Sequence, residues 1–257
     1  MPTIVQKFGG TSVSDAARIR RAAQRVADAR ASGFDVVVVA SAMGSTTDDL
    51  ITLADQVSAS PDRRELDMLM ATGEQASVAL LAMALRELGC PASSLTGGQA
   101  GIRTDGVHGR ARITRIECGR LERLISRGEI PVVAGFQGTS DEGEITTLGR
   151  GGSDTTAVAI AAALHISESG GYCEIFTDVD GVYTADPRLV RSAVKLPRIS
   201  YEEMLELATL GAGVLHARAV LFGEKYGVPI HVRHSQKPDH GTMISRENPN
   251  MEETSTL

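Results

Sequence analysis

The stretch DVVVVASAMGSTT, from Asp35 to Thr47, contains the pattern that decides the fold. Four consecutive valines leave no polar face, so both sides of this strand are expected to be buried, as in a parallel sheet covered by helices on both faces. The strand runs into a loop of small residues, Ser41 to Thr47, and a helix is expected from about Asp48 to Val57. We therefore predict an α/β fold, a three-layer α/β/α sandwich around a mainly parallel sheet.

The rest of the chain alternates aliphatic strands with helices in the same way. Further strands are expected at 3–8, 92–95, 130–135, 173–177 and 228–232, with part of a hairpin at 143–147. Further helices are expected at 14–32, 63–88, 119–127, 154–164, 201–209 and 218–226. Ser14 is expected to cap the first of these helices, and a break is expected near Thr72-Gly73. Because ligands bind at the carboxyl ends of strands in such sheets, the loops after Phe8, Ala40, Gly135 and Thr177 are expected to carry the site.

Length and charge exclude several classes of function. The 257 residues fit one large α/β domain or two small ones, and the formal net charge of −6 argues against general nucleic-acid binding. The start MPTIVQKFGG lacks the features of a signal peptide, and no apolar run reaches the roughly 18–20 residues of a membrane helix. The three cysteines are widely spaced and form no metal-binding pattern. We expect a cytoplasmic protein without a membrane partner or a protein-built metal site.

A lysine and two glycines end the first strand, in Lys7-Phe8-Gly9-Gly10-Thr11-Ser12. Glycines let backbone N–H groups approach a ligand closely, and the lysine adds positive charge, so this segment suits an anion. It is not a Walker A loop, because GxxxxGK[ST] does not occur in the chain. A simple Gly-Gly turn beside a solvated lysine explains the same residues equally well.

The segment Gly149-Arg150-Gly151-Gly152-Ser153-Asp154 is a stronger indication of a site. Three glycines surround one arginine at the start of an Ala-rich helix, where backbone amides and the helix dipole favour a phosphate. Arg150 suits bidentate binding of a carboxylate. Asp154 either caps its own helix or holds a polar group near a transferred phosphate.

An acidic loop, TDVDGVYTADPR from Thr177 to Arg188, follows another expected strand. It lacks the spacing of an EF-hand, so calcium is not expected. Tyr183 could pack on a base and Arg188 reach phosphates, or the loop is simply solvated. Glu74, at the expected helix break, is a weaker candidate by itself.

His231 and His234 are too unfavourably spaced for a shared metal, because side chains at odd spacing in a strand point to opposite faces.

Eight segments, in this order along the chain, together resemble the aspartate kinases of the amino-acid-kinase family. They are VQKFGGTSV (5–13), VVVVASAMGSTTDDL (36–50), MLMATGEQ (68–75), GGQAGIRTD (97–105), PVVAGFQG (131–138), TTLGRGGSDTTA (146–157), FTDVDGVYTADPR (176–188) and YEEMLELATLGAGVLHARAV (201–220). The resemblance spans nearly the whole chain. It implies transfer of the γ-phosphoryl group of MgATP to the side-chain carboxylate of L-aspartate, giving 4-phospho-L-aspartate on the way to lysine, threonine and methionine.

The resemblance also implies a role for each site residue. Lys7 would stabilise the transferring phosphoryl group and Asp154 would organise the reacting centre. Glu74 would face the ammonium group of aspartate and Arg150 its α-carboxylate. The remaining aspartate-binding residues would be Ser41, Thr47, Gly151, Gly152 and Ser153. The nucleotide would contact Lys7, Gly9, Gly10, Ser41, Thr177, Asp178, Tyr183 and Arg188, with Mg²⁺ carried by its phosphates.

The chain also departs from the family pattern. Gly213 stands where many relatives have a lysine that reaches ATP phosphates. We expect one catalytic domain over 1–250, with aspartate bound by its N-terminal part and the nucleotide by about 170–245, and a short tail over 251–257. Relatives usually continue into a pair of ACT domains that bind end-product amino acids. None is expected here, so intrinsic feedback inhibition is not expected, and a homodimer or a separate regulatory subunit stays open.

Two other functions stay open. One is a related kinase that acts on another carboxylate, and the other is a non-catalytic binding subunit of the same fold.

Overall fold

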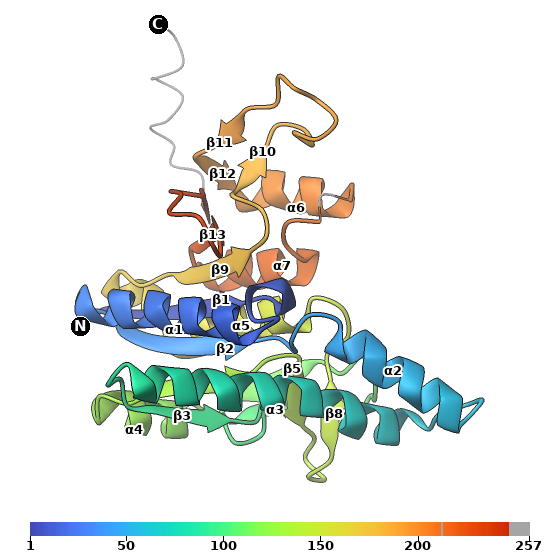
Figure 1. Ribbon diagram of the computed structural model, residues 1–257. Coiled ribbons are helices and arrows are strands. Elements are labelled where there is room, and N and C mark those ends of the chain that lie inside the picture. Colours follow the sequence, from blue (N-terminus) through green and yellow to red (C-terminus); the bar gives the residue numbers. More distant parts are fainter. Residues whose placement is uncertain (212, 247–257) are drawn as a thin grey trace, which may run out of the picture.

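The computed structural model describes residues 1–211 and 213–246, so the expected tail over 251–257 lies outside the described residues. An eight-stranded sheet runs through the molecule in the order β12-β14-β13-β9-β1-β2-β6-β3. Neighbouring strands are parallel except β13 and β14. Helices α1 and α3 cover one face and α4 to α7 the other (Figure 1). The predicted three-layer sandwich is confirmed.

The main sheet consists of β1 (Thr3–Phe8), β2 (Asp35–Ala40), β3 (Ala92–Leu95), β6 (Ile130–Ala134), β9 (Cys173–Thr177), β12 (Arg198–Ser200), β13 (Ile230–His234) and β14 (Thr242–Ser245). Two smaller sheets contain β4 (Ile102–Thr104), β5 (Ile113–Ile116), β7 (Gln137–Thr139) and β8 (Ile145–Thr147), and β10 (Val182–Tyr183) and β11 (Lys195–Leu196). The helices are α1 (Ala16–Ala31), α2 (Thr46–Val57), α3 (Arg63–Glu87), α4 (Gly119–Ser126), α5 (Gly152–Ala163), α6 (Tyr201–Thr209) and α7 (Ala217–Tyr226), with short 3-10 turns at Gly10–Ser12 and Ile166–Ser169.

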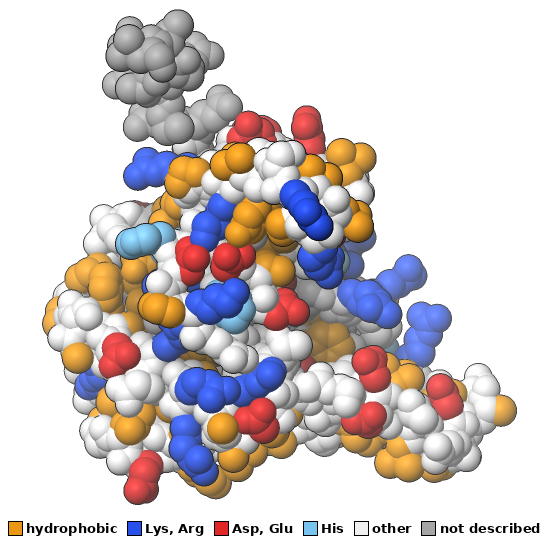
Figure 2. Space-filling view, turned by 45° about the horizontal axis from the view of Figure 1, so that its top comes forward, with side chains coloured by type: hydrophobic (Ala, Val, Ile, Leu, Met, Phe, Trp, Pro, Cys, Tyr) orange, Lys and Arg blue, Asp and Glu red, His pale blue; other side chains and the backbone are white. Residues whose placement is uncertain are grey.

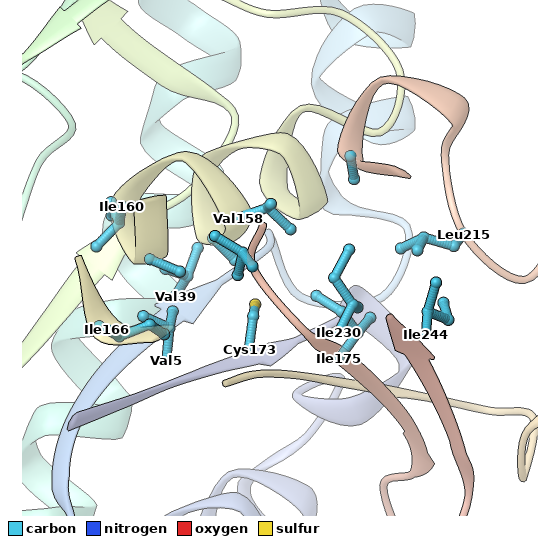
Figure 3. Close-up of a cluster of buried hydrophobic side chains, with 14 of the residues drawn as sticks. Val5, Val39, Val158, Ile160, Ile166, Cys173, Ile175, Leu215, Ile230 and Ile244 are labelled. Carbon is cyan, nitrogen blue, oxygen red and sulfur yellow. The ribbon is translucent and has the colours of Figure 1, made fainter. Parts of the chain in front are cut away.

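The valines of β2 are divided between two hydrophobic cores, one on each face of the sheet. Val36 and Val38 pack with the side chains of α1 and α3, whereas Val37 and Val39 pack with those of α5. Figure 3 shows the second core, where the sheet meets α5. Alternate residues of a strand point to opposite faces, so the same rule directs Lys7 in β1 towards α5. The side chain of Lys7 therefore lies on the face of the sheet where α5 carries Asp154.

Helix α3 is continuous from Arg63 to Glu87, so the expected break near Thr72-Gly73 is wrong. A Cβ on Gly73 would lie 2.8 Å from the Cβ of Ala42, which means that the glycine lets the loop after β2 pack against the helix rather than interrupting it. By length and composition alone α3 could cross a membrane, contrary to the expectation from apolar runs. Half of its apolar window is buried inside the protein, as in a core helix.

Several boundaries differ from those predicted. Asp15, not Ser14, caps α1 by accepting a hydrogen bond from the backbone N–H of Arg18. Helix α2 begins two residues earlier than expected, and so does α5, because Gly151 adopts the left-handed conformation that starts that helix. The strand expected at 228–232 is shifted to Ile230–His234. Strand β14 was not predicted, since its four residues form no aliphatic run.

Candidate active site

Lys7 and Asp154 form a largely buried ion pair where β1 meets α5. The lysine Nζ lies 2.7 Å from Asp154 Oδ1, and the two side chains are only 11% and 14% exposed. Asp154 is the third residue of α5, and the cap position is occupied by Gly151, so Asp154 does not cap its helix. Lys7 is likewise largely buried, so the interpretation as a solvated lysine beside a Gly-Gly turn is wrong. The pair leaves the ammonium group of Lys7 held near a helix N-terminus, where an anion is favoured.

Glu74 is buried in the middle of α3 and faces the loop after β2. Its Oε1 accepts a hydrogen bond from the backbone N–H of Ala42 at 3.0 Å. Its Oε2 has no hydrogen-bond partner among the described residues. Burial raises the pKa of Glu74 to about 7, and the hydrogen bond from Ala42 only partly offsets this effect. A buried acceptor without a donor is costly in a folded protein, so this oxygen is suited to a ligand that donates.

An open cleft of about 620 Å³ gathers most of the predicted residues. Ten of them line it, namely Lys7, Gly10, Ser41, Thr47, Glu74, Arg150, Gly151, Gly152, Ser153 and Asp154. They come from the end of β1 and the turn after it, from the loop after β2 and the start of α2, from α3, and from the segment that leads from β8 into the first turn of α5. Figure 2 shows Lys and Arg side chains beside the base of the arm formed by α2 and the start of α3. The cleft therefore combines a buried acid with two basic side chains.

Two glycines of the cleft are required by close packing. A Cβ on Gly10 would lie 2.8 Å from the carbonyl oxygen of Ala42. A Cβ on Gly151 would lie 2.2 Å from Cγ of His216, and Gly151 also has a φ of +69°. Both loops therefore bring bare backbone to the rim of the cleft, which is the arrangement that lets amide N–H groups approach a phosphate.

The residues expected to bind the nucleotide are not gathered in this cleft, apart from Lys7, Gly10 and Ser41. Asp178 lines a separate hollow and accepts a hydrogen bond from Oγ1 of Thr177. Tyr183 donates its hydroxyl to Asp180, and Arg188 pairs with Asp186 on the surface. Gly9 follows Lys7 on the same turn; a Cβ there would lie 3.4 Å from the lysine Nζ.

A second hollow, of about 350 Å³ and distinct from the one that Asp178 lines, adjoins the cleft through Gly151 and Asp154. Its other wall is the segment before and at the start of α7, including Gly213 and His216. Arg218 extends from α7 and donates a hydrogen bond to the carbonyl of Leu148. This segment belongs to one of the family-like motifs, but no local sequence pattern places it beside the glycine-rich loop.

Other lining residues were not predicted, among them Ala42, Ile51, Met70, Gly109, Phe136 and Thr147. Phe136 has a φ of +67°, which is rare for a residue with a bulky side chain. Two hydrogen bonds hold it there: its N–H donates to Thr156 Oγ1, and its carbonyl accepts from Leu148 N–H. Strain that the surrounding structure maintains in this way is common at binding sites.

The two histidines of β13 make separate contacts. His231 Nδ1 lies 3.8 Å from Glu174, while Nδ1 of His234 accepts the backbone N–H of Gln236. Among residues 1–211 and 213–246, no group of three or more His, Cys, Asp and Glu side chains is arranged to hold a metal ion. The cleft presents charged side chains and backbone amides, which can bind an anion beside Lys7, a carboxylate at Arg150 and a donor at Glu74.

The comparisons with known proteins agree with this geometry. The chain is 58% identical over 247 residues to an aspartokinase of Geobacillus stearothermophilus, a match that covers 96% of this chain and 60% of that protein. The solved aspartate kinase from Synechocystis matches at a TM-score of 0.83 and 51% identity, over 95% of this chain and 40% of that one. Aspartokinase III of E. coli, solved in complex with aspartate and ADP, matches at 0.84 and 30% identity, over 96% and 65%.

The chain thus spans about 60% of the length of the first of these relatives. A sequence profile describing the amino acid kinase family matches residues 2–234, which include every predicted site residue. The chain belongs to the amino acid kinase family.

Proposed function

We propose that this chain transfers the γ-phosphoryl group of MgATP to the side-chain carboxylate of L-aspartate, giving 4-phospho-L-aspartate and ADP. The observation that carries the proposal is the buried, half-satisfied carboxylate of Glu74, which lines the same cleft as Arg150. An α-amino acid offers an ammonium group to the first and a carboxylate to the second. Two relatives that match this chain at 58% and 57% identity are named aspartokinases, which supports aspartate as the acceptor.

Two residues of the cleft would act on the reacting groups. Lys7 would neutralise negative charge that develops on the transferred phosphoryl oxygens, and Asp154 would hold the lysine side chain in place at 2.7 Å. The attacking aspartate carboxylate is already a nucleophile, so no general base is needed. A new P–O bond forms to that carboxylate as the bond between the γ-phosphorus and the bridging oxygen breaks, and ADP leaves with the electron pair. Catalysis then depends on positioning two anions and screening their charge.

The nucleotide is proposed to lie across the glycine-rich turns and the second hollow. The fit rests on the crowded glycines: a Cβ at Gly10 or Gly151 would collide with Ala42 or His216, so only bare backbone, with its accessible N–H groups, fits at these turns. ATP would supply the phosphoryl group, and Mg²⁺ would be carried on its phosphates. Thr177, Asp178, Tyr183 and Arg188 are proposed to contact the rest of the nucleotide. For that to happen Arg188 would have to exchange its partner Asp186 for phosphate.

The product is proposed to enter the biosynthesis of lysine, threonine and methionine, in the cytoplasm. Purified protein with L-aspartate, ATP and Mg²⁺ should form an aspartyl hydroxamate when hydroxylamine is present, and Lys7→Met should form it about 10²–10³-fold more slowly. Glutamate and N-acetylglutamate serve as competing acceptors. Turnover of either in preference to aspartate would replace the proposal with a kinase for another carboxylate, and no hydroxamate with any acceptor would refute it.

A parallel reaction with lysine plus threonine tests the response to end products. An unchanged rate supports the further proposal that this chain by itself is not feedback-inhibited, and a reduced rate overturns it.

A further inference from the structure

We propose that Asp67 is a positioning residue that fixes one wall of the substrate cleft and thereby sets the affinity for the amino-acid substrate. The inference rests on the proposed function, since it concerns the same cleft. It adds a residue that touches neither substrate and that acts through Gly109 and Thr147.

Asp67 is completely buried in α3, two helical turns before Glu74. Its carboxylate accepts hydrogen bonds from three residues. Thr147 Oγ1 donates at 2.5 Å, His108 Nδ1 lies at 2.8 Å, and the backbone N–H of Gly109 lies at 3.1 and 3.0 Å from the two oxygens. All of these partners lie more than 40 residues away in sequence, so the carboxylate joins three separate segments of the chain.

The two acids of α3 differ in how well they are satisfied. Each oxygen of Asp67 has two donors, whereas one oxygen of Glu74 has none among the described residues. A buried carboxylate contributes little to stability even when it is paired, because desolvation opposes the attraction. A full set of donors is nevertheless a rigid arrangement. Asp67 therefore suits a role in holding structure, and Glu74 suits a role in binding.

What Asp67 holds is the lining of the cleft. Gly109 and Thr147 both line it. The carbonyl of Thr147 also accepts the N–H of Ala111, which closes the loop 105–111 against β8. The carbonyl of Gly109 would lie 3.4 Å from a Cβ on Gly149, so this loop packs against the residue just before Arg150. Through these contacts Asp67 fixes the distance between the Glu74 side of the cleft and the Arg150 side.

His108 provides the cleanest variants, because it can be changed while the buried carboxylate of Asp67 stays in place. His108→Ala removes one donor to Asp67, and His108→Asn keeps a donor in the place of Nδ1. His165→Ala is the matched control, since His165 also pairs with a carboxylate, that of Glu168 at 3.4 Å, but lies exposed and away from the cleft. Asp67→Asn tests the carboxylate itself.

Steady-state kinetics with the purified chain should separate the two substrates. We expect His108→Ala to raise KM for L-aspartate about fivefold, the equivalent of one hydrogen bond, with KM for ATP unchanged. His108→Asn should restore most of that loss, and His165→Ala should behave as wild type. Asp67→Asn should exceed His108→Ala in the same direction. An unchanged KM for L-aspartate in the folded His108→Ala and Asp67→Asn variants overturns the inference, as does an equal rise for both substrates.

Hydrogen exchange at the backbone amide of Gly109 gives a second measurement that does not need turnover. That amide should exchange slowly in wild type and in His108→Asn, and faster in Asp67→Asn. If wild type forms no product from aspartate, the proposed function fails, and this exchange then decides the positioning role separately. Equal exchange in wild type and Asp67→Asn would overturn it.

Discussion

Replacing Glu74 with glutamine removes a negative charge from the interior while nearly keeping the shape of the side chain. In the wild-type protein the carboxyl is 3% exposed, and one of its oxygens has no partner among the described residues. Glutamine can keep the hydrogen bond from Ala42 through its own oxygen. The substitution therefore isolates the contribution of the charge to stability and to binding.

The magnitude follows from the pKa of Glu74, which burial raises from 4.5 to about 7. Below pH 4.5 the group is protonated in both the folded and the unfolded chain, so it does not change the free energy of unfolding. Between pH 4.5 and 7 the unfolded chain has lost its proton while the folded chain keeps it, so the free energy of unfolding falls as pH rises. Above pH 7 the loss is complete, at about 3 kcal/mol for a pKa difference of about 2.5.

Urea denaturation at several pH values between 5 and 8.5 measures this difference. We expect Glu74→Gln to become more stable relative to wild type by about 2–3 kcal/mol across that range. Glu87→Gln, an exposed change at the end of the same helix, should alter stability by less than about 0.5 kcal/mol throughout. Parallel stability curves for wild type and Glu74→Gln would refute the reasoning.

Binding should move in the opposite direction from stability. Glu74→Gln should lose affinity for L-aspartate, because the unpartnered oxygen that would accept from the ammonium group has become a donor. A gain of stability together with a loss of affinity is typical of a side chain that is retained for function. Isothermal calorimetry with L-aspartate at pH 8 measures the loss of affinity. An unchanged affinity in Glu74→Gln would contradict the assignment of Glu74 to the ammonium group.

Three further substitutions test the rest of the cleft. Lys7→Met should lower kcat by about 10²–10³-fold, as loss of one charge-stabilising group does, and should leave Asp154 unpaired; steady-state kinetics and a melting curve check both effects. Gly151→Ala should destabilise the protein by more than about 1 kcal/mol, since the new Cβ would collide with His216 in a left-handed conformation; thermal unfolding measures this. Arg150→Lys should raise KM for L-aspartate about tenfold or more while KM for ATP changes little, because lysine cannot form the bidentate pair.

Most of the fold could be predicted because the strands of the central sheet carry strong local signals. The valines of β2 are apolar on both faces, and the structure divides them between two cores as the pattern requires. The single continuous α3 could not be foreseen at Gly73, because a glycine that admits a neighbouring loop looks the same in sequence as one that breaks a helix. Strand β14 was missed for a related reason: its four residues, which pair with β12 on one side and β13 on the other, have no aliphatic pattern of their own.

The candidate site was predictable where residues of one chemical kind are adjacent in sequence. Lys7 and Gly10 line the same cleft as the segment around Arg150. The contacts that hold them together join distant segments, and no local pattern reports such contacts. Asp67 illustrates this most clearly, because its donors come from a loop and a strand 41 to 80 residues further on.

The two acids of α3 also explain why that helix combines an apolar surface with buried charge. A 25-residue helix with the hydropathy of a membrane span would pack more easily without Asp67 and Glu74, since each buries a carboxylate at a desolvation cost. For Asp67, donors within the protein offset this desolvation cost. Glu74 keeps one oxygen that is available to a donor from a ligand. The helix thus carries, two turns apart, one carboxylate held by donors of the protein and one with an oxygen left for a donor. The ammonium group that we propose to bind at Glu74 would then face a cleft wall that Asp67 holds in place.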